Sequence, residues 1–283
     1  MAANIKHELK GIDLGDVRRN RRIGTLAAKM AASPTESLRS ACGGWSDAIA
    51  GYRLLHSDSV TPEKILAAHE SAAMERAGLC QRLLLVQDTT ELDYSKHKAL
   101  NGVGRLDAQT RQGFYAHCHL LLDEDTGVPM GVCSSHIWTR DQETKDNEHK
   151  QVPFEDKESY RWFQGYVHGC EIAALQPHAE VTVVGDRESD IYDIYAENQR
   201  RSRAGEPCAH VLIRASGDRS LLVEEGSGEH PNRLFAAVRG GSELGTYKVQ
   251  VTEKDQIRKK REATASSSTA RNAKPPCKCV RCA

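Results

Sequence analysis

Two aspartates, each placed after a short apolar run, are the residues of this chain best suited to joint chemistry. Asp88 follows the run 83–86, and Asp186 follows the run 181–185. A leucine-rich or β-branched run that closes on a carboxylate is typical of a buried strand carrying an acid to the edge of a sheet. Two such strands can place two carboxylates side by side, the minimum set that holds a divalent metal for phosphodiester chemistry. The alternative is that each Asp only caps the turn or helix after its strand.

The elements around these acids predict a mixed α/β domain. Three strands come first, joined in part by a hairpin turn at 123–127, and two strand–helix units follow. The predicted strands are 83–87, 114–122, 128–133, 181–185 and 209–214, and the predicted helices are 157–175 and 190–200. An antiparallel meander followed by such units is the order of the ribonuclease H-like fold, whose acids lie at the ends of the first and fourth strands. Asp88 and Asp186 fall at those two places, which favours a catalytic pair over two caps.

The first 80 residues predict a small helical domain. Ser33-Pro34-Thr35-Glu36 and Thr61-Pro62-Glu63 both look like helix starts, with a capping hydroxyl, an early proline and an acid in the first turn. The basic cluster Arg18–Arg22 precedes an apolar pattern with spacings of three and four. Its arginines are candidates for phosphate contacts, although a solvated helix face accounts for the charge equally well.

Charge and composition set limits on the class of protein. The net charge is zero, yet residues 1–30 hold seven Lys/Arg against three Asp/Glu and residues 255–283 hold eight against two, which leaves −10 for 31–254. Basic ends around an acidic centre suit a metal–carboxylate core flanked by phosphate-contacting segments. The sequence contains no apolar stretch of membrane-spanning length and no signal-peptide core, so we expect a cytoplasmic protein without a membrane partner. Six of the nine cysteines are scattered singly, which favours free thiols.

Two further segments complete the expected domain organisation. Residues 219–257 are interpreted as part of a β-rich insertion, with a strand over 247–251. Residues 258–283 form a basic tail without a core-forming pattern, expected to be disordered. Cys277, Cys279 and Cys282 lie close together in it, but a structural zinc site would need a fourth ligand. The predicted domains are therefore 1–80, 81–218, 219–257 and the tail 258–283.

The motifs together resemble those of the bacterial cut-and-paste insertion-sequence transposases, which have a ribonuclease H-like core and an Asp-Asp-Glu triad. The resemblance extends over roughly residues 10–260, and the Asp-Thr-Thr and Asp-Arg-Glu-Ser-Asp-Ile motifs are specific in combination. The matching stretches are Leu14–Arg19, Gly51–Leu55, Gln87–Tyr94, Lys157–Ser159 with Trp162, and Gly185–Tyr192.

The resemblance implies a DNA transposase that nicks transposon ends and joins them to target DNA with two Mg²⁺ (or Mn²⁺) ions. Asp88 and Asp186 would be the first two metal-binding catalytic acids, and the N-terminal domain would bind transposon-end DNA. Arg214 matches a basic position near bound DNA in the family. The partners it implies are transposon-end and target DNA and a second subunit, either a homodimer or a heterodimer with full-length transposase. The residues expected to contact DNA are Arg18, Arg19, Arg21, Arg22, Arg53 and Arg214.

The family's third acid lies in a Tyr-x-x-Arg-x-x-x-Glu-x-x-x-x-x-x-Lys motif, and no segment here has that spacing. We therefore expect impaired catalysis, and the abrupt change of composition near Ala263 suggests a shift of reading frame, with an authentic, diverged C-terminus as the alternative. The alternatives are a catalytically inactive DNA-binding regulator of transposition and a nuclease that acts on RNA–DNA hybrids. Glu188 is the nearest substitute ligand, although a helix cap or a surface ion pair is the favoured role. His117 and His119 share one face of their predicted strand, where packing is favoured over metal binding.

Overall fold

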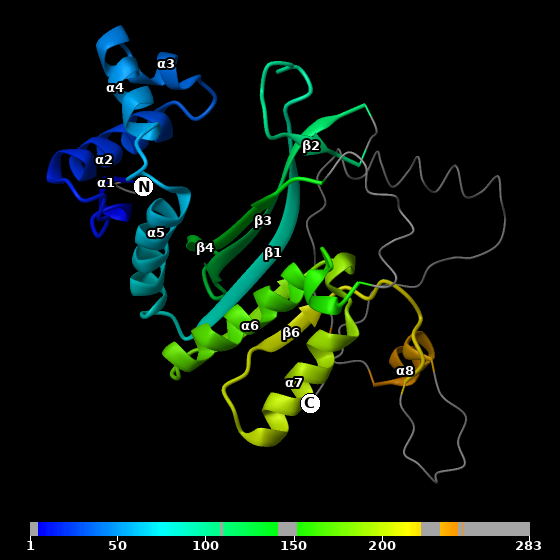
Figure 1. Ribbon diagram of the computed structural model, residues 1–283. Coiled ribbons are helices and arrows are strands. Elements are labelled where there is room, and N and C mark those ends of the chain that lie inside the picture. Colours follow the sequence, from blue (N-terminus) through cyan, green and yellow to red (C-terminus); the bar gives the residue numbers. More distant parts are fainter. Residues whose placement is uncertain (1–4, 108–109, 141–151, 222–232, 243–244, 246–283) are drawn as a thin grey trace. The chain divides into compact units, whose positions relative to one another are not determined.

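The computed structural model describes residues 5–107, 110–140, 152–221, 233–242 and 245 (Figure 1). The chain divides into two compact units, residues 1–216 and 217–283. The first unit holds a group of helices followed by a sheet with two further helices, and the second contains α8 (Leu234–Gly240). No helix among these described ranges is long and apolar enough to cross a membrane.

The N-terminal helices are short and enclose a core of their own. They are α1 (Ile5–Glu8), α2 (Val17–Ala32), α3 (Leu38–Cys42), α4 (Trp45–Leu55) and α5 (Pro62–Ala77). Buried residues at helical spacing, including Ile23, Leu26 and Leu54, pack together with Leu14. The start predicted at Thr61 is confirmed, because its side chain accepts a hydrogen bond from the Lys64 amide and Pro62 occupies the first turn.

The helix start predicted at Ser33 is wrong. Ser33 ends α2, and its amide bonds to the carbonyl of Met30. The next helix begins after Ser37, whose hydroxyl accepts a hydrogen bond from the Ser40 amide. Ser37 was not singled out in the sequence because neither a proline nor an acid follows it in the first turn of α3.

The sheet has the strand order β2-β3-β1-β5-β6. β4 also pairs with β3, along a different stretch of that strand from β2. Its members are β1 (Arg82–Asp93), β2 (Gly104–Arg105), β3 (Gln112–Asp123), β4 (Pro129–Trp138), β5 (Glu180–Gly185) and β6 (His210–Ile213). β1, β3 and β4 run antiparallel, whereas β5 and β6 are parallel to β1. Every predicted strand in this part of the chain is confirmed, and β2 was not predicted because it has only two residues.

The expectation that the first strand ends at Asp88 is wrong. β1 continues to Asp93 because β3 stays paired with it through Asp93 and Gly113. The parallel pairing with β5, however, stops at Val86 and Val184. Asp88 therefore lies in a stretch of β1 that β3 supports on one side and β5 no longer supports on the other.

Two helices cover one face of the sheet, α6 (Tyr160–Leu175) and α7 (Tyr192–Ala204) (Figure 1). Trp162 and Tyr166 from α6 and Ile194 from α7 pack with the alternate buried residues of β1 and β5. The approach of α6 is close: a Cβ added at Gly169 would lie 2.3 Å from Cγ2 of Val183. Both helices confirm the helices predicted from the sequence, with starts two or three residues later.

The described part of the second unit is small. Ser220 and Arg233 form an isolated antiparallel bridge, and the Asp218 side chain accepts a hydrogen bond from the Phe235 amide near the start of α8. The strand predicted over 247–251 and the tail 258–283 lie outside the described residues. The six singly placed cysteines, Cys42, Cys80, Cys118, Cys133, Cys170 and Cys208, are free thiols.

Candidate active site at the edge of the parallel strands

The register of the sheet places Asp88, Asp186 and Arg214 in one row across three neighbouring strands. Val86, Val184 and Leu212 are paired across β1, β5 and β6. Asp88 lies in β1 two positions beyond Val86, whereas Asp186 and Arg214 directly follow the last residues of β5 and β6. All three side chains are exposed. The register thus places the two acids and the arginine, which come from distant parts of the sequence, at corresponding positions of three neighbouring segments of chain.

Local hydrogen bonds fix the Asp186 end of this row. Asp186 caps the short 3₁₀ helix η3 (Arg187–Ser189), and its Oδ1 accepts a hydrogen bond of 2.8 Å from the Glu188 amide. The Ser189 hydroxyl donates to the Asp186 carbonyl at 2.6 Å. Gly185 is required before this turn because a Cβ there would lie 2.2 Å from Ser189 Oγ. The capping role considered for Asp186 is therefore present, and it orients a carboxylate that remains exposed.

Asp88 is held differently, by the strand itself. Its Oδ1 accepts a hydrogen bond of 2.8 Å from the Thr89 amide, and its backbone is paired with Cys118 of β3. Gln87 and Thr89, which flank it, point to the opposite face of the sheet, where α6 packs. The alternation of the strand therefore gives β1 an exposed acid on one face and a buried polar network on the other.

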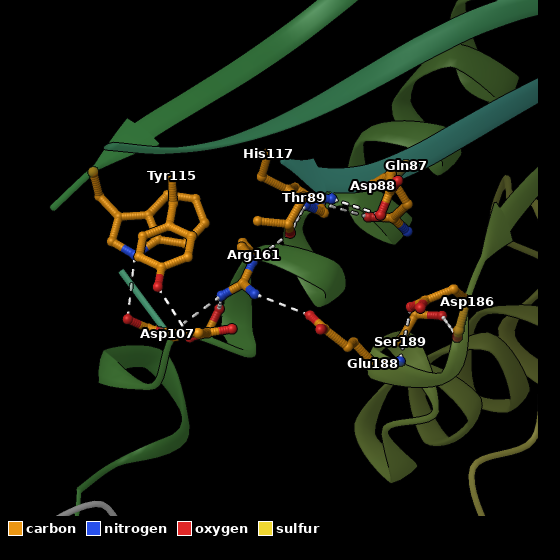
Figure 2. A network of polar contacts seen from close by, with 12 residues as sticks. Gln87, Asp88, Thr89, Asp107, Tyr115, His117, Arg161, Asp186, Glu188 and Ser189 are labelled. Carbon is orange, nitrogen blue, oxygen red and sulfur yellow. Dashed lines mark hydrogen bonds and ion pairs between the residues drawn. The ribbon is translucent and has the colours of Figure 1, made fainter. Parts of the chain in front are cut away.

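Arg161 joins the two acid-bearing segments (Figure 2). Its Nε donates to the Thr89 hydroxyl at 3.2 Å, and its Nη2 donates to Oε2 of Glu188 at 3.3 Å. The side chain is only 10% exposed, and its guanidinium lies 4.6 Å from the centre of the Trp138 ring. Burial lowers the pKa of Arg161, against the attraction of Glu158 and Glu188. Sequence analysis missed this residue, although it lies inside the motif around Glu158 and Trp162.

A chain of hydrogen bonds continues from Thr89 into the core. The Thr89 hydroxyl lies 2.9 Å from Nδ1 of His117, and Nε2 of His117 lies 3.2 Å from Oε1 of Gln87. Gln87 in turn donates to the Trp162 carbonyl. Because Oε1 of Gln87 can only accept, the proton of neutral His117 is assigned to Nε2, and Nδ1 accepts from Thr89. Burial, with a smaller contribution from His119, lowers the pKa of His117 to about 3, so the ring is neutral at physiological pH.

A second arginine, Arg140, extends this network just beyond the end of β4. Arg140 donates from Nε to Glu158 at 2.6 Å and also pairs with Asp107, and its guanidinium lies 4.3 Å from the centre of the Tyr115 ring. The hydrogen bonds with Glu158 raise the pKa of Arg140 despite its partial burial. Arg140 and Arg161 thus share Glu158 as a neighbour, but the connection to Thr89 and Glu188 is made by Arg161.

The N-terminal helices present the other predicted DNA contacts. Arg18, Arg21 and Arg22 on α2 and Arg53 on α4 are exposed. Arg19 is partly buried and has a structural role, because it donates to the Leu14 carbonyl and to the Ser59 hydroxyl. Sequence analysis did not single out Trp45, whose ring is 65% exposed at the start of α4 with the Arg39 guanidinium 5.0 Å from its centre.

The described residues include no group of three or more His, Cys, Asp or Glu side chains placed to hold a metal ion. Glu188 points to Arg161 and therefore does not complete such a group with the two aspartates. His117 and His119 share the buried face of β3, where His117 packs against the Trp162 ring at 4.5 Å. Asp88 and Asp186 are exposed carboxylates at this edge.

The comparison with known protein families agrees with the N-terminal part of this description. Residues 1–60 match the family model for a transposase DNA-binding domain. The match includes α1 to α4 and all five arginines predicted there to contact DNA. The chain therefore carries a transposase DNA-binding domain at its N-terminus, which supports DNA as a partner.

Proposed function

We propose that this protein is a transposase-type protein that binds the ends of a DNA element and directs metal-dependent nicking and strand transfer from the edge formed by Asp88 and Asp186. The observation that carries the proposal is the row of Asp88, Asp186 and Arg214 in a chain whose first 60 residues match a transposase DNA-binding domain. The two parts of the chain point independently to the same substrate.

The topology of the sheet supports a ribonuclease H-like core. Three antiparallel strands, β1, β3 and β4, are followed by β5 and β6 parallel to β1, with a helix before each of the last two. This is the arrangement expected from the resemblance of the motifs. In such a core the first two acids belong to adjacent strands, and here Asp88 lies in β1 and Asp186 directly follows β5, which pairs with β1.

Two carboxylates suit a Mg²⁺ or Mn²⁺ ion whose remaining coordination positions are filled by water and by substrate phosphate. Mg²⁺ prefers hard oxygen ligands and is commonly bound through one or two carboxylates together with waters and substrate phosphates. Asp88 and Asp186 offer exposed carboxylates just beyond the end of the β1–β5 ladder, and we propose that they hold the metal. When bound, the ion would stabilise charge on the phosphate and activate a hydroxyl nucleophile.

The cationic side chains divide into two groups with different tasks. Arg214 follows β6 beside Asp186 in the register, where a guanidinium can hold a phosphate next to the acids. Arg18, Arg21, Arg22 and Arg53 would fix the protein on the backbone of the end DNA. Trp45, exposed and stacked with Arg39, provides an aromatic surface for contact with a base or sugar.

A second candidate is a DNA-binding regulator of transposition. The observation in its favour is that the described residues hold no cluster of three potential metal ligands. A protein that binds element ends with two acids alone would occupy them and cut weakly or not at all. The two candidates share DNA binding and differ in metal-dependent cleavage.

The experiment uses the full chain and duplexes from the two flanks of its gene, where the ends of an element would lie. We expect a gel shift with one flanking sequence at salt concentrations that abolish binding to a scrambled duplex of equal length. Nicking of the bound duplex in Mn²⁺, lost in Asp88→Asn, would select the transposase. Binding without nicking would select the regulator, and equal binding to both duplexes would overturn end recognition.

A further inference from the structure

We infer that Arg161 is a positioning residue that holds the Asp88-bearing strand and the Asp186-bearing turn in the mutual arrangement that metal binding requires. The inference rests on the proposed function, because it takes the two aspartates as the metal ligands. It assigns a task to a buried cation that neither the sequence motifs nor the family match explains.

Arg161 binds residues that lie one position from Asp88 and two positions from Asp186 along the chain. Thr89, which accepts from Nε, is the residue directly after Asp88. Glu188, which accepts from Nη2, is two residues after Asp186, and its own amide donates to Oδ1 of Asp186. One guanidinium is therefore separated from each acid by one or two residues of chain. A displacement of either segment would stretch a hydrogen bond to Arg161.

Backbone hydrogen bonds between β1 and β5 do not fix the Asp88 segment relative to the Asp186 segment. The pairing of β1 with β5 ends at Val86 and Val184, so the ladder between these strands does not reach the two acids. Asp186 then leaves the strand direction to cap η3, while Asp88 continues along β1 with β3. Beyond the end of the ladder, the Arg161 side chain connects the Thr89 segment to the Glu188 segment.

The surroundings of Arg161 make it rigid and specific for arginine. Its three nitrogen atoms donate in three directions, to Thr89 from Nε, to the Glu158 carbonyl from Nη1 and to Glu188 from Nη2. Its guanidinium plane lies against Trp138, which itself donates to Oε1 of Glu158 at 3.2 Å. A lysine ammonium is a single point donor and cannot reproduce this fork. In this proposal Arg161 itself contacts neither metal nor DNA; those contacts are assigned to the exposed Asp88, Asp186 and Arg214.

Hydrogen exchange tests the bridge without any metal. We would compare the wild-type chain with Arg161→Lys and use Arg140→Lys as a matched control, because Arg140 is also stacked on an aromatic ring and also pairs with Glu158. Arg161→Lys should accelerate exchange of the Glu188 and Ser189 amides at least about tenfold, and Arg140→Lys should leave them unchanged. Unchanged exchange in Arg161→Lys would overturn the bridge, as would equal acceleration in both variants.

If Arg161 positions the two aspartates, its replacement should weaken metal binding. The affinity for Mn²⁺ can be measured from the electron paramagnetic resonance signal of the free ion. Changes to residues that orient the ligands of a metal site typically cost about 10–100-fold in affinity. Arg161→Lys should therefore weaken Mn²⁺ binding about tenfold, whereas Arg140→Lys should keep the wild-type affinity because, among the described residues, Arg140 contacts neither acid-bearing segment. Glu188→Ala should weaken it less, and the double variant should be no weaker than Arg161→Lys alone, because both act through one bridge.

The outcomes separate the inference from the proposed function. Wild-type affinity in Arg161→Lys, with binding still lost in Asp88→Asn, would overturn the positioning role and leave the metal site intact. Additive losses in the double variant would also overturn it, since Glu188 would then act separately. Absence of Mn²⁺ binding to the wild-type chain would overturn the metal site itself and with it the role assigned to Arg161.

Discussion

Asp88 and Asp186 each lie two residues beyond a directly paired couple, Val86 and Val184, on neighbouring parallel strands. They therefore occupy corresponding positions just beyond the end of one parallel ladder, although they come from distant parts of the sequence. The two carboxylates are held by different means. Asp186 is oriented by the turn that it caps, whereas Asp88 is carried by a strand that continues past it.

The first prediction separates the capping role of Asp186 from its proposed role as a ligand. Asp186→Ala removes the acceptor of the Glu188 amide and should lower the free energy of unfolding by about 1 kcal/mol. Asp186→Asn keeps a side-chain oxygen and should stay within about 0.5 kcal/mol of the wild-type chain. Urea denaturation measures both values. If the two variants lose equal stability, the cap is not what holds the turn.

The second prediction concerns DNA affinity of the N-terminal domain. Each of Arg22→Ala and Arg53→Ala should weaken binding to the flanking duplex and reduce the slope of log K against log salt by about 0.9 for each phosphate that the protein no longer neutralises. Arg200→Ala on α7 is the control, because Arg200 is an exposed arginine that pairs with Glu197 and Glu206. A slope that changes in Arg200→Ala and not in Arg22→Ala would contradict this assignment.

The third prediction follows from the close approach of α6 to the sheet. In Gly169→Ala the new Cβ would lie 2.3 Å from Val183 Cγ2 in the core, and the overpacking should cost about 1–3 kcal/mol. Gly24→Ala on α2 meets no atom within 4 Å and should stabilise the chain by up to about 1 kcal/mol. Thermal unfolding of the two variants should move in opposite directions. A gain in stability for Gly169→Ala would show that α6 can move away from β5.

The fourth prediction concerns pH. Burial lowers the pKa of His117 to about 3 and that of His119 to about 4, whereas in the unfolded chain both titrate near 6.5. Below about pH 6.5 the unfolded state binds protons that the folded state does not, so stability is complete above that pH and is lost as the pH falls to about 4 for His119 and about 3 for His117. Each imidazole contributes a slope of up to about 1.4 kcal/mol per pH unit.

Urea denaturation at about pH 7, 6 and 5 measures this slope. His117→Gln should reduce it, because one of the two buried imidazoles is then absent. His210→Gln is the control, since His210 is exposed at the start of β6. Equal slopes in the wild-type chain and in His117→Gln would show that His117 does not stay neutral in the folded state.

Much of the fold could be predicted from periodicity and punctuation in the sequence. The runs before Asp88 and Asp186 indicated their strands, and Thr61 with Pro62 marked the start of α5, because these signals act within a few residues. The misses have equally local causes. Ser33, Pro34 and Glu36 matched the pattern of a helix start, whereas the helix begins after Ser37, which lacks the proline and the acid of that pattern. The continuation of β1 to Asp93 depends on pairing with β3, which a single strand does not encode.

The site was only half predictable for a related reason. Asp88, Asp186 and Arg214 each come after an apolar run, so their type and position were visible in the sequence. The role of Arg161 depends on Thr89, 72 positions earlier, and on Glu188, 27 positions later. Its contacts arise only when α6 packs on the sheet. An arginine inside a motif of acids and aromatics was the one signal present, and it does not specify partners.

The most direct test of the central claim is a Mn²⁺ titration of the wild-type chain, Asp88→Asn and Asp186→Asn, with Asp193→Asn as the control. Asp193 is an exposed carboxylate in the first turn of α7, and it lies outside the row of the two acids. If Asp88 and Asp186 form one metal site, each of their variants should weaken Mn²⁺ binding at least about tenfold, and Asp193→Asn should leave it unchanged. Wild-type affinity in either Asp88→Asn or Asp186→Asn would contradict a shared site.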